Sequence, residues 1–285
     1  MHAINIISYN MGINIRDFAW ECDYLKQKID ESEEGQQMYK EAQENTTNSL
    51  ANRASVYLLQ EVEKEDRLLI KGLKMAGCEI FHVMNNPKTP EKTRSREVFD
   101  CAVVLKMDEF EAIENHSKMI NGYDMAMVTA THQLTKESMI FVSGHAPGLN
   151  LDDKKFWQAD LKDGDKYCQA ILDEIAVLKD SKVHIVGADM NANPEAMEKI
   201  GQKEREWKHR FEKFDAAGFE TCRTGKSTNV RPDSVYCKRE LDFIFARSTS
   251  NFFKPIGKPE RLLKWDSSLN ASDHRPILAK LPLAY

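Results

Sequence analysis

Short apolar runs rich in β-branched residues recur along the chain, and each ends in polar residues. Five of these runs carry a reactive group at or inside one end; they lie at 4–8, 56–59, 139–143, 183–186 and 241–245. Runs of this length, bounded by Gly, Pro and Asn, are typical of buried strands. Similar runs predict further strands near 78–83, 102–105 and 125–131.

Segments of helical character alternate with the predicted strands. The pattern predicts helices at 20–29, 65–75, 169–178 and 195–214, the last of them long and strongly charged. Residues from about 30 to 52 are rich in Glu, Gln and Asn and predict a polar insertion. Strands interleaved with helices indicate an α/β fold.

Polar motifs accompany the five runs and a sixth follows near the end of the chain. They are Asn10, Gln60-Glu61, Gly144-His145-Ala146-Pro147, Asp189-Met190-Asn191, Leu241-Asp242-Phe243-Ile244 and Ser272-Asp273-His274. Most of them, taken singly, also fit a turn, a helix start or an Asx turn. Asp242 does not, because an unpaired carboxylate inside an apolar strand is costly. Jointly the motifs predict one site at the rim where strands meet loops.

In this order the motifs resemble the signature of the endonuclease/exonuclease/phosphatase superfamily, the deoxyribonuclease I-like fold. The resemblance runs from Asn10 to Pro276, and it is specific for the superfamily but not for the substrate. One departure is Ala188, where the family usually has Gly before the Asp of its Asp-x-Asn pair. The resemblance implies a single catalytic domain over residues 1–285, built as a four-layer α/β sandwich of two packed mixed β-sheets flanked by helices.

The side-chain types of the motifs also indicate a metal. Carboxylates and an amide without thiolates select a hard cation, so Mg²⁺ is the predicted cofactor, with Mn²⁺ as a substitute. Glu61 is the predicted principal ligand, assisted by Asn10 and Asp273. The predicted reaction is in-line attack of water on a phosphate ester.

Five further residues are the predicted catalytic groups. Asp189 would orient or deprotonate the water, and Asn191 would hydrogen-bond the nucleophile or a phosphoryl oxygen. His145 and His274 would donate to the developing negative charge. Asp242 would hold His274 in one tautomer and favour its protonated form.

Charge distribution bears on the substrate more than the net charge of −5 does. Basic residues cluster in three segments that flank the motifs: Lys88, Lys92, Arg94 and Arg96; Arg223, Lys226, Arg231, Lys238 and Arg239; Lys254, Lys258, Arg261 and Lys264. Trp207, Tyr236 and Trp265 lie among or near them and could stack on bases. Nucleic acid is therefore the predicted substrate. A phosphatase or phospholipase acting on inositol phosphates or lipid headgroups is the alternative, and a non-catalytic interaction module on the same fold is a third hypothesis.

The cysteines and the apolar pattern give an expectation about location. The six cysteines are scattered without a Cys-x-x-Cys pair, which argues against a zinc site or a disulfide-rich secreted scaffold. No apolar run approaches the ~20 residues of a membrane span, and Asn10 leaves no room for a signal peptide before the site. We expect a monomer in the cytoplasm or another reducing compartment, with export by a non-classical route still open.

Overall fold

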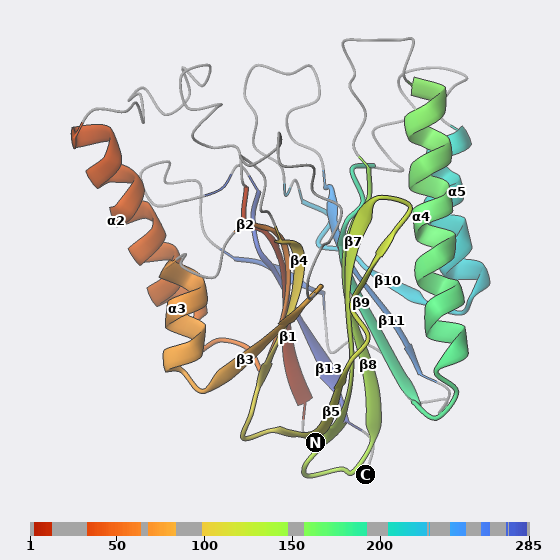
Figure 1. The fold of residues 1–285 in the computed structure, drawn as a ribbon, viewed down its shortest axis with the longest axis horizontal. Coiled ribbons are helices and arrows are strands. Elements are labelled where there is room, and N and C mark those ends of the chain that lie inside the picture. Colours follow the sequence, from red (N-terminus) through yellow and green to blue (C-terminus); the bar gives the residue numbers. More distant parts are fainter. Residues whose placement is uncertain are drawn as a thin grey trace.

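The computed structural model of the chain describes residues 3–12, 33–63, 68–83, 99–147, 157–192, 205–226, 228, 240–248, 258–262, 272 and 274–283. Two β-sheets pack face to face, and helices cover the outer face of each (Figure 1). The predicted four-layer α/β sandwich of two mixed sheets is confirmed.

The first sheet has six strands. Their order is β12 (Glu260–Arg261), β13 (Ile277–Pro282), β1 (Ala3–Asn10), β2 (Val56–Glu63), β4 (Phe99–Lys106) and β3 (Cys78–His82). Only β1 and β2 are paired in parallel; the other pairs are antiparallel. The two parallel strands therefore end at the same edge, which places the residues after both runs side by side.

The second sheet has seven strands and repeats this plan. Along it lie β10 (Glu220–Cys222), β11 (Asp242–Ser248), β9 (Val183–Asp189), β8 (Ser138–His145), β7 (Tyr123–His132) and β5 (Phe110–Asn115), with β6 (Lys118–Ile120) paired to β7. Strands β8 and β9 form its parallel pair. Their ends bring His145 opposite Asp189.

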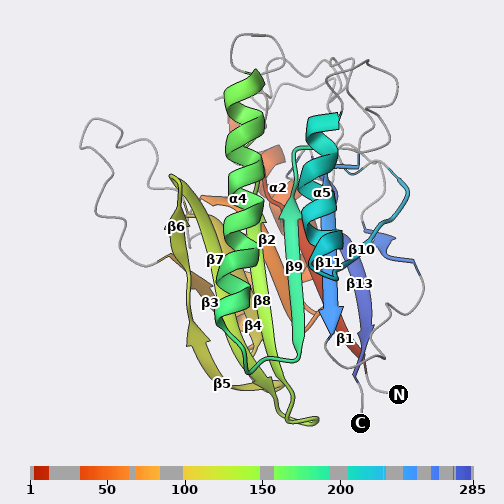
Figure 2. The same ribbon diagram turned by 90° about the vertical axis from the view of Figure 1, so that its right-hand side faces the viewer.

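Four helices in the described residues complete the outer layers. Helices α2 (Glu33–Leu50) and α3 (Leu68–Met75) cover the first sheet, and α4 (Trp157–Val177) and α5 (Arg205–Ala216) lie together over the second (Figures 1 and 2). Side chains alternate along the strands as the pleat requires. On β1, Ile6 points into the core between the sheets, whereas Ile7 joins the apolar cluster beneath α3. None of the helices in the described ranges could cross a membrane.

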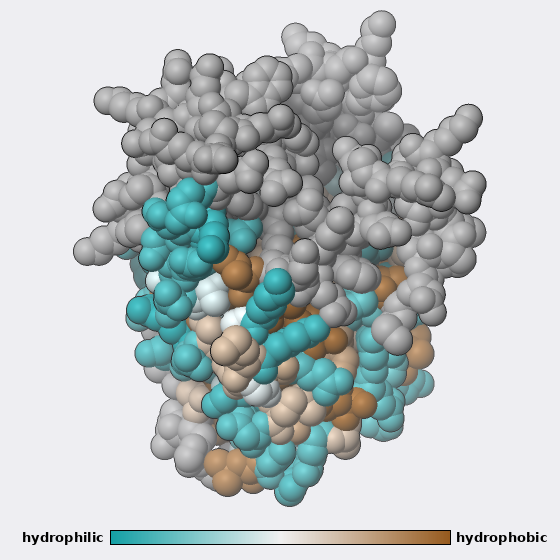
Figure 3. All heavy atoms as spheres, turned by 60° about the vertical axis from the view of Figure 1, so that its left-hand side comes forward, coloured by the Kyte–Doolittle hydropathy of each residue, from teal (hydrophilic) through white to brown (hydrophobic). Residues whose placement is uncertain are grey.

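The segment predicted as a polar insertion contains the whole of α2. Although its composition is polar, Ala42, Thr46 and Leu50 are buried, and α2 packs on α3. Hydrophilic and hydrophobic residues are interspersed over the described part of this side of the molecule (Figure 3). The segment is therefore part of the helical layer that covers the first sheet.

Most predicted elements that lie in the described ranges are present with shifted ends. The helix predicted at 169–178 is the second half of α4, and the one predicted at 195–214 overlaps α5. The short strands β5, β6, β10 and β12 were not predicted. The helix predicted at 20–29 lies outside the described residues.

Candidate active site

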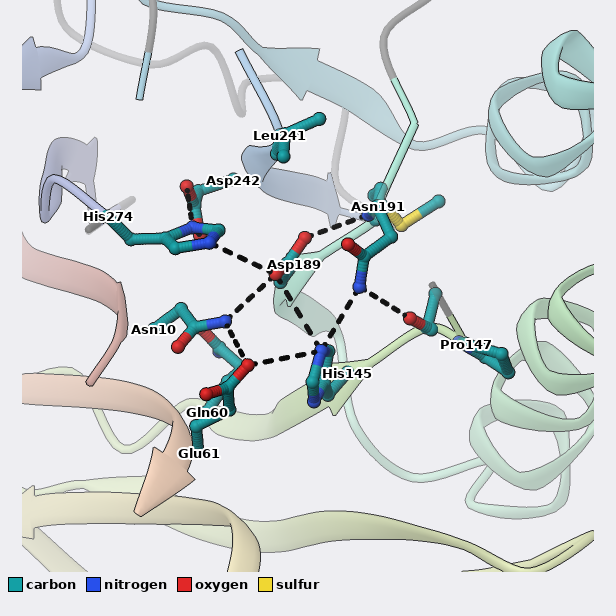
Figure 4. A network of polar contacts seen from close by, with 12 residues as sticks. Asn10, Gln60, Glu61, His145, Pro147, Asp189, Asn191, Leu241, Asp242 and His274 are labelled. Atoms are coloured by element: carbon teal, nitrogen blue, oxygen red, sulfur yellow. Dashed lines mark hydrogen bonds and ion pairs between the residues drawn. The ribbon is translucent and has the colours of Figure 1, made fainter. Parts of the chain in front are cut away.

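Asn10 joins the two sheets at the end where the parallel strands finish. Its side chain is fully buried. Its Nδ2 donates to Glu61 Oε1 at 3.0 Å and to Asp189 Oδ2 at 2.9 Å (Figure 4). Its Oδ1 accepts from the backbone N–H of Gly12 at 2.9 Å. The predicted ligand Asn10 thus presents its amide nitrogen to both carboxylates.

Glu61 has an unusual backbone conformation. Its φ is +50°, and the pairing of β2 with β4 shifts register between Gln60 and Glu63. Such a bulge re-aims a side chain away from the regular alternation of the strand, and a positive φ is uncommon for a residue other than Gly. The Glu61 side chain remains 19 % exposed, so its carboxylate is reachable from solvent at the edge of the sandwich.

Asp189 and Asn191 form a tight turn at the end of β9. Asp189 Oδ1 accepts from the backbone N–H of Asn191 at 2.8 Å, and Asn191 has φ +45°. This is an Asx turn, a conformation that Asn tolerates well. The turn leaves Asp189 Oδ2 for the groups across the site, although the residue is only 1 % exposed. Asp189 therefore uses one carboxylate oxygen in the turn and presents the other to the site.

His145 faces both carboxylates. Its Nε2 lies 3.7 Å from Glu61 Oε1 and 3.7 Å from Asp189 Oδ2. Asn191 Nδ2 lies 3.1 Å from the same ring nitrogen and donates to Ala146 O at 2.9 Å. Because the carbonyl identifies Nδ2 as the donor, Nε2 of a neutral His145 accepts, and its proton is on Nδ1.

The predicted pairing of Asp242 with His274 is present. His274 Nδ1 lies 2.9 Å from Asp242 Oδ2, and both side chains are buried. Burial raises the pKa of the Asp242 carboxyl, an effect that His274 opposes. The backbone N–H of Asp242 donates to Thr228 Oγ1 at 3.1 Å. His274 Nε2 then lies 3.8 Å from Asp189 Oδ2, so the imidazole stands between two acids.

Ser272 fixes His274 to the first sheet. Its hydroxyl donates to Asn10 O at 2.8 Å and accepts from the backbone N–H of His274 at 3.0 Å. The site thus brings together all the predicted residues except Asp273, which lies outside the described residues. In the described part of the chain, two groups offer donor atoms within 4.8 Å of one another: Glu61, His145 and Asp189, and Asp189, Asp242 and His274.

Sequence reasoning gave no role to the polar residues beneath the site. Gln60 is fully buried between the sheets, and its Nε2 donates to Ser143 Oγ at 3.0 Å and to Leu58 O at 2.9 Å. Nearby, a Cβ added to Gly187 would lie 2.6 Å from Leu58 Cβ. Gln60 stands in a quoted motif and Gly187 lies two residues before another, and these positions are the only sequence signal that the two residues give.

The predicted basic segments are only partly described. Arg223 is ion-paired with the buried Glu240 at 3.3 Å, so its charge is already partnered. Lys226 is exposed. Residues 84–98 and 229–239, which carry most of the others, lie outside the described residues.

Comparison with known proteins supports the fold through structure. No protein-family model matches the sequence, and no curated protein matches it. Among solved structures, an endonuclease/exonuclease/phosphatase from Bacteroides vulgatus aligns over 100 % of both chains, with a TM-score of 0.64 and 13 % identity. The chain has the endonuclease/exonuclease/phosphatase fold. The resemblance in the motifs and the similarity in structure therefore agree.

Two more solved structures with the endonuclease/exonuclease/phosphatase fold contain nucleotide ligands. ANGEL2, described as a 2′,3′-cyclic phosphatase, was solved with adenosine-2′,3′-vanadate; it covers 98 % of this chain and 95 % of its own, with a TM-score of 0.66 and 13 % identity. TDP2 from D. rerio was solved with a single-strand DNA product. The alignment covers 99 % of this chain and 100 % of the TDP2 chain, with a TM-score of 0.59 and 13 % identity. At these identities the comparison concerns the fold.

Proposed function

We propose that the chain is a phosphoesterase that hydrolyses phosphodiester bonds, most directly those of nucleic acid, with a divalent cation as cofactor. The observation that carries the proposal is the convergence of five side chains at one end of the sandwich, linked by contacts of 2.9 to 3.8 Å: Asn10, Glu61, His145, Asp189 and His274. One chain supplies all five groups, so we expect a monomer to be sufficient for activity.

The donor set fits a hard cation. Glu61 and Asp189 present carboxylate oxygens, no cysteine belongs to either donor group in the described residues, and Glu61 is reachable from solvent. Carboxylate and carbonyl oxygens are the ligands that Mg²⁺ and Mn²⁺ prefer. Glu61 would be the principal ligand. Asn10 Oδ1 keeps a second lone pair beyond its bond from Gly12, and Asp273 completes the predicted set. The bound cation would polarise a phosphoryl oxygen and offset its charge.

Asp189 is the proposed base. Its Oδ1 is used by the turn to Asn191, whereas Oδ2 faces His145, His274 and the amide of Asn10. A carboxylate held in this way can accept a proton from an attacking water or orient it toward phosphorus. The hydrogen bonds fix the carboxylate before substrate arrives, so little reorganisation is needed during the reaction.

His274 and, once its Nε2 is protonated, His145 are the proposed donors to the phosphoryl oxygens. Asp242 accepts from Nδ1 of His274 and leaves Nε2 directed at Asp189, the side on which the phosphoryl group would lie. A carboxylate paired in this way stabilises the protonated imidazole. His145 supplies a second imidazole on the opposite side of Asp189 (Figure 4). Both would stabilise charge that develops on oxygen in the transition state.

Nucleic acid is the proposed substrate because two observations point the same way. Basic residues are clustered in the segments before Asp242 and Asp273, and two solved structures of this fold were determined with nucleotide ligands. An inositol phosphate or a lipid headgroup is the alternative substrate, and the assay below separates the two.

The test is a panel of substrates assayed with Mg²⁺ and with a chelator. The panel holds single-stranded DNA, RNA, plasmid DNA, oligonucleotides with modified ends, inositol phosphates and sphingomyelin, and the matched control is Asp189→Asn. We expect cleavage of at least one nucleic acid that the chelator and the substitution both remove. Turnover of inositol phosphate or lipid alone would replace the substrate assignment, and no turnover of any member would contradict the enzyme hypothesis.

A further inference from the structure

A buried arginine lies behind the site, in the helical layer of the second sheet. Arg210 of α5 is 1 % exposed. Its Nη1 donates to Met190 O at 2.7 Å and its Nη2 donates to Pro147 O at 3.2 Å. The two carbonyls belong to the segments that follow β9 and β8, so one guanidinium ties the ends of two parallel strands together.

Both carbonyls directly flank residues of the site. The Met190 carbonyl belongs to the peptide bond that leads into Asn191, whose φ is +45°. The N–H of Met190 donates to Leu241 O at 2.9 Å, so this residue is held on both sides. Pro147 follows Ala146, the residue whose carbonyl accepts from Asn191 Nδ2. Arg210 thus holds the backbone on either side of the contact between Asn191 and His145.

Gly164 of helix α4 leaves room for this guanidinium. A Cβ added to Gly164 would lie 1.9 Å from Arg210 Nη2 and 2.2 Å from Cζ. Gly is among the poorest helix formers because it loses the most backbone entropy. Its place inside α4 is explained by the planar group that packs against the helix backbone there. Gly164 and Arg210 therefore form one structural unit, which spans α4, α5 and the two strand ends.

The geometry points to Arg210, seated on Gly164, as a positioning residue that sets the Asn191–His145 contact. Without the guanidinium, the Met190 and Pro147 carbonyls lose a buried charged donor. The two segments keep the bond from the Ala146 N–H to Asp189 O at 2.9 Å, but the residues beyond it are held less firmly. The contact of Asn191 Nδ2 with His145 Nε2 would then weaken, and the imidazole would lose a bond that favours the tautomer with the proton on Nδ1. The effect on the His145 ring can be measured without any substrate, whereas its consequence for turnover rests on the proposed function.

The first measurement is NMR of the His145 ring nitrogens in the metal-free protein, with the pH raised until the ring is neutral, so that only its tautomer is compared. We expect an unprotonated Nε2 and a protonated Nδ1 in the native chain. Arg210→Lys keeps the charge but cannot bind two carbonyls in one plane, and Gly164→Ala displaces the guanidinium without removing it. Both variants should give a mixture of the two tautomers. Arg210→Met is a third variant, and the first two keep the test decisive if it fails to fold.

Arg247→Met is the matched control. Arg247 is a second arginine beside α5, although it is only half-buried. It donates to Ala217 O at 2.7 Å and to His184 Nδ1 at 3.1 Å, remote from the strand ends. Its loss should lower the melting temperature and leave the His145 ring unchanged. The inference is overturned if Arg210→Lys and Gly164→Ala lower the melting temperature with the native tautomer retained, or if Arg247→Met alters the ring equally.

The second measurement is turnover of whichever substrate the panel identifies. Arg210→Lys and Gly164→Ala should each lower kcat by about tenfold to a hundredfold, a range typical of residues that orient a reacting group, with a smaller change in KM. A rise in KM with kcat unchanged would contradict the positioning role. If the panel yields no substrate, the proposed function fails while the NMR result still decides the role of Arg210.

Discussion

Asn10 donates to Asp189 from the opposite sheet, with 2.9 Å between Nδ2 and Oδ2. The two residues end β1 and β9 and are 179 positions apart in the sequence. The same nitrogen lies 3.0 Å from Glu61 Oε1. One amide therefore connects the proposed metal ligand to the proposed base, so a change at either acid is expected to alter the other.

Glu61→Gln tests the metal ligand. The substitution removes a negative donor with little change in shape, so cation affinity should fall, and activity should fall steeply and recover in part at high Mg²⁺ or with Mn²⁺. The measurement is initial rate against Mg²⁺ concentration. Glu79→Gln, on the exposed edge strand β3, is the control and should behave as the native chain. Native activity of Glu61→Gln at limiting Mg²⁺ would reject the assignment.

Asp189→Asn and His274→Ala test the shared role around one phosphoryl group. Because both side chains act on the same transition state, each change should lower kcat by about 10²- to 10³-fold. The double variant should be little worse than the poorer single one. Circular dichroism would establish that all three variants are folded. If the loss of kcat in the double variant instead equals the product of the two single losses, the two residues act independently.

Asp242→Asn tests the support of His274. An amide cannot stabilise the protonated imidazole as a carboxylate does, so less of His274 is protonated at a given pH. We expect kcat to fall by about tenfold to a hundredfold, and the decline of activity with rising pH to begin at a lower pH. A pH–rate profile checks both. A reduced rate with an unchanged profile would leave Asp242 with a purely structural role.

His184 gives a prediction about stability rather than turnover. Burial, followed by the charge of Arg247, lowers the pKa of His184 from 6.5 to about 4. Between these values the unfolded chain binds a proton that the folded chain excludes, so stability falls as the pH drops from 6.5 to 4, by at most about 3 kcal/mol. Urea unfolding measured across this pH range should show that the free energy of unfolding depends less steeply on pH in His184→Gln than in the native chain. The exposed His209→Gln is the control, and equal slopes for native and His184→Gln chains would refute the prediction.

Salt dependence separates a polymer substrate from a compact one. Each phosphate contact contributes close to one unit to the slope of log affinity against log salt. Lys226 and Lys238 precede Asp242, so replacing both with Ala should flatten the slope by up to about two units for an oligonucleotide. Arg223 is left out because Glu240 already partners it.

Binding is best measured with Asp189→Asn protein, which should retain the substrate. The control is Lys280→Ala, since Lys280 is exposed on β13 and pairs with the start of β1, at the end of the sandwich opposite the site. Absence of oligonucleotide binding even at low salt would favour the inositol phosphate or lipid alternative.

The sequence predicted the strands that end in the site and the residues they carry. It did so because a buried strand leaves a short apolar run, and a reactive group after such a run stands out. Asp242 was the clearest case, since a carboxylate among Leu, Phe and Ile requires a partner, and His274 is that partner. The residues that hold the site from behind left no such signal. Arg210 lies in a helix whose many charges predict a solvated surface.

Helix α2 and the short strands show where pattern reasoning fails for a different reason. Few apolar residues mark α2, yet tertiary packing on α3 buries Leu50 and Thr46. Strand β12 has only two residues, too few for any period to appear. The positive φ of Glu61 depends on a bulge opposite β4. Each of these features is determined by a neighbour that is distant in sequence.

Because of Gly187, the sandwich should tolerate added side-chain volume between its sheets less well near the site than at the other end. The missing side chain of Gly187 lets β9 approach Leu58 closely, just behind the strand ends that carry the reactive groups. A methyl group there would wedge the two sheets apart, and Asn10 and Asp189, which stand on different sheets, would separate with them. Val183 occupies the far end of the same strand, so a change in sheet spacing there lies farther from the reactive groups and should disturb them less. The spacing between the sheets thus sets the distance between the reactive groups that stand on them. Random mutagenesis should therefore find folded but inactive proteins concentrated around this glycine.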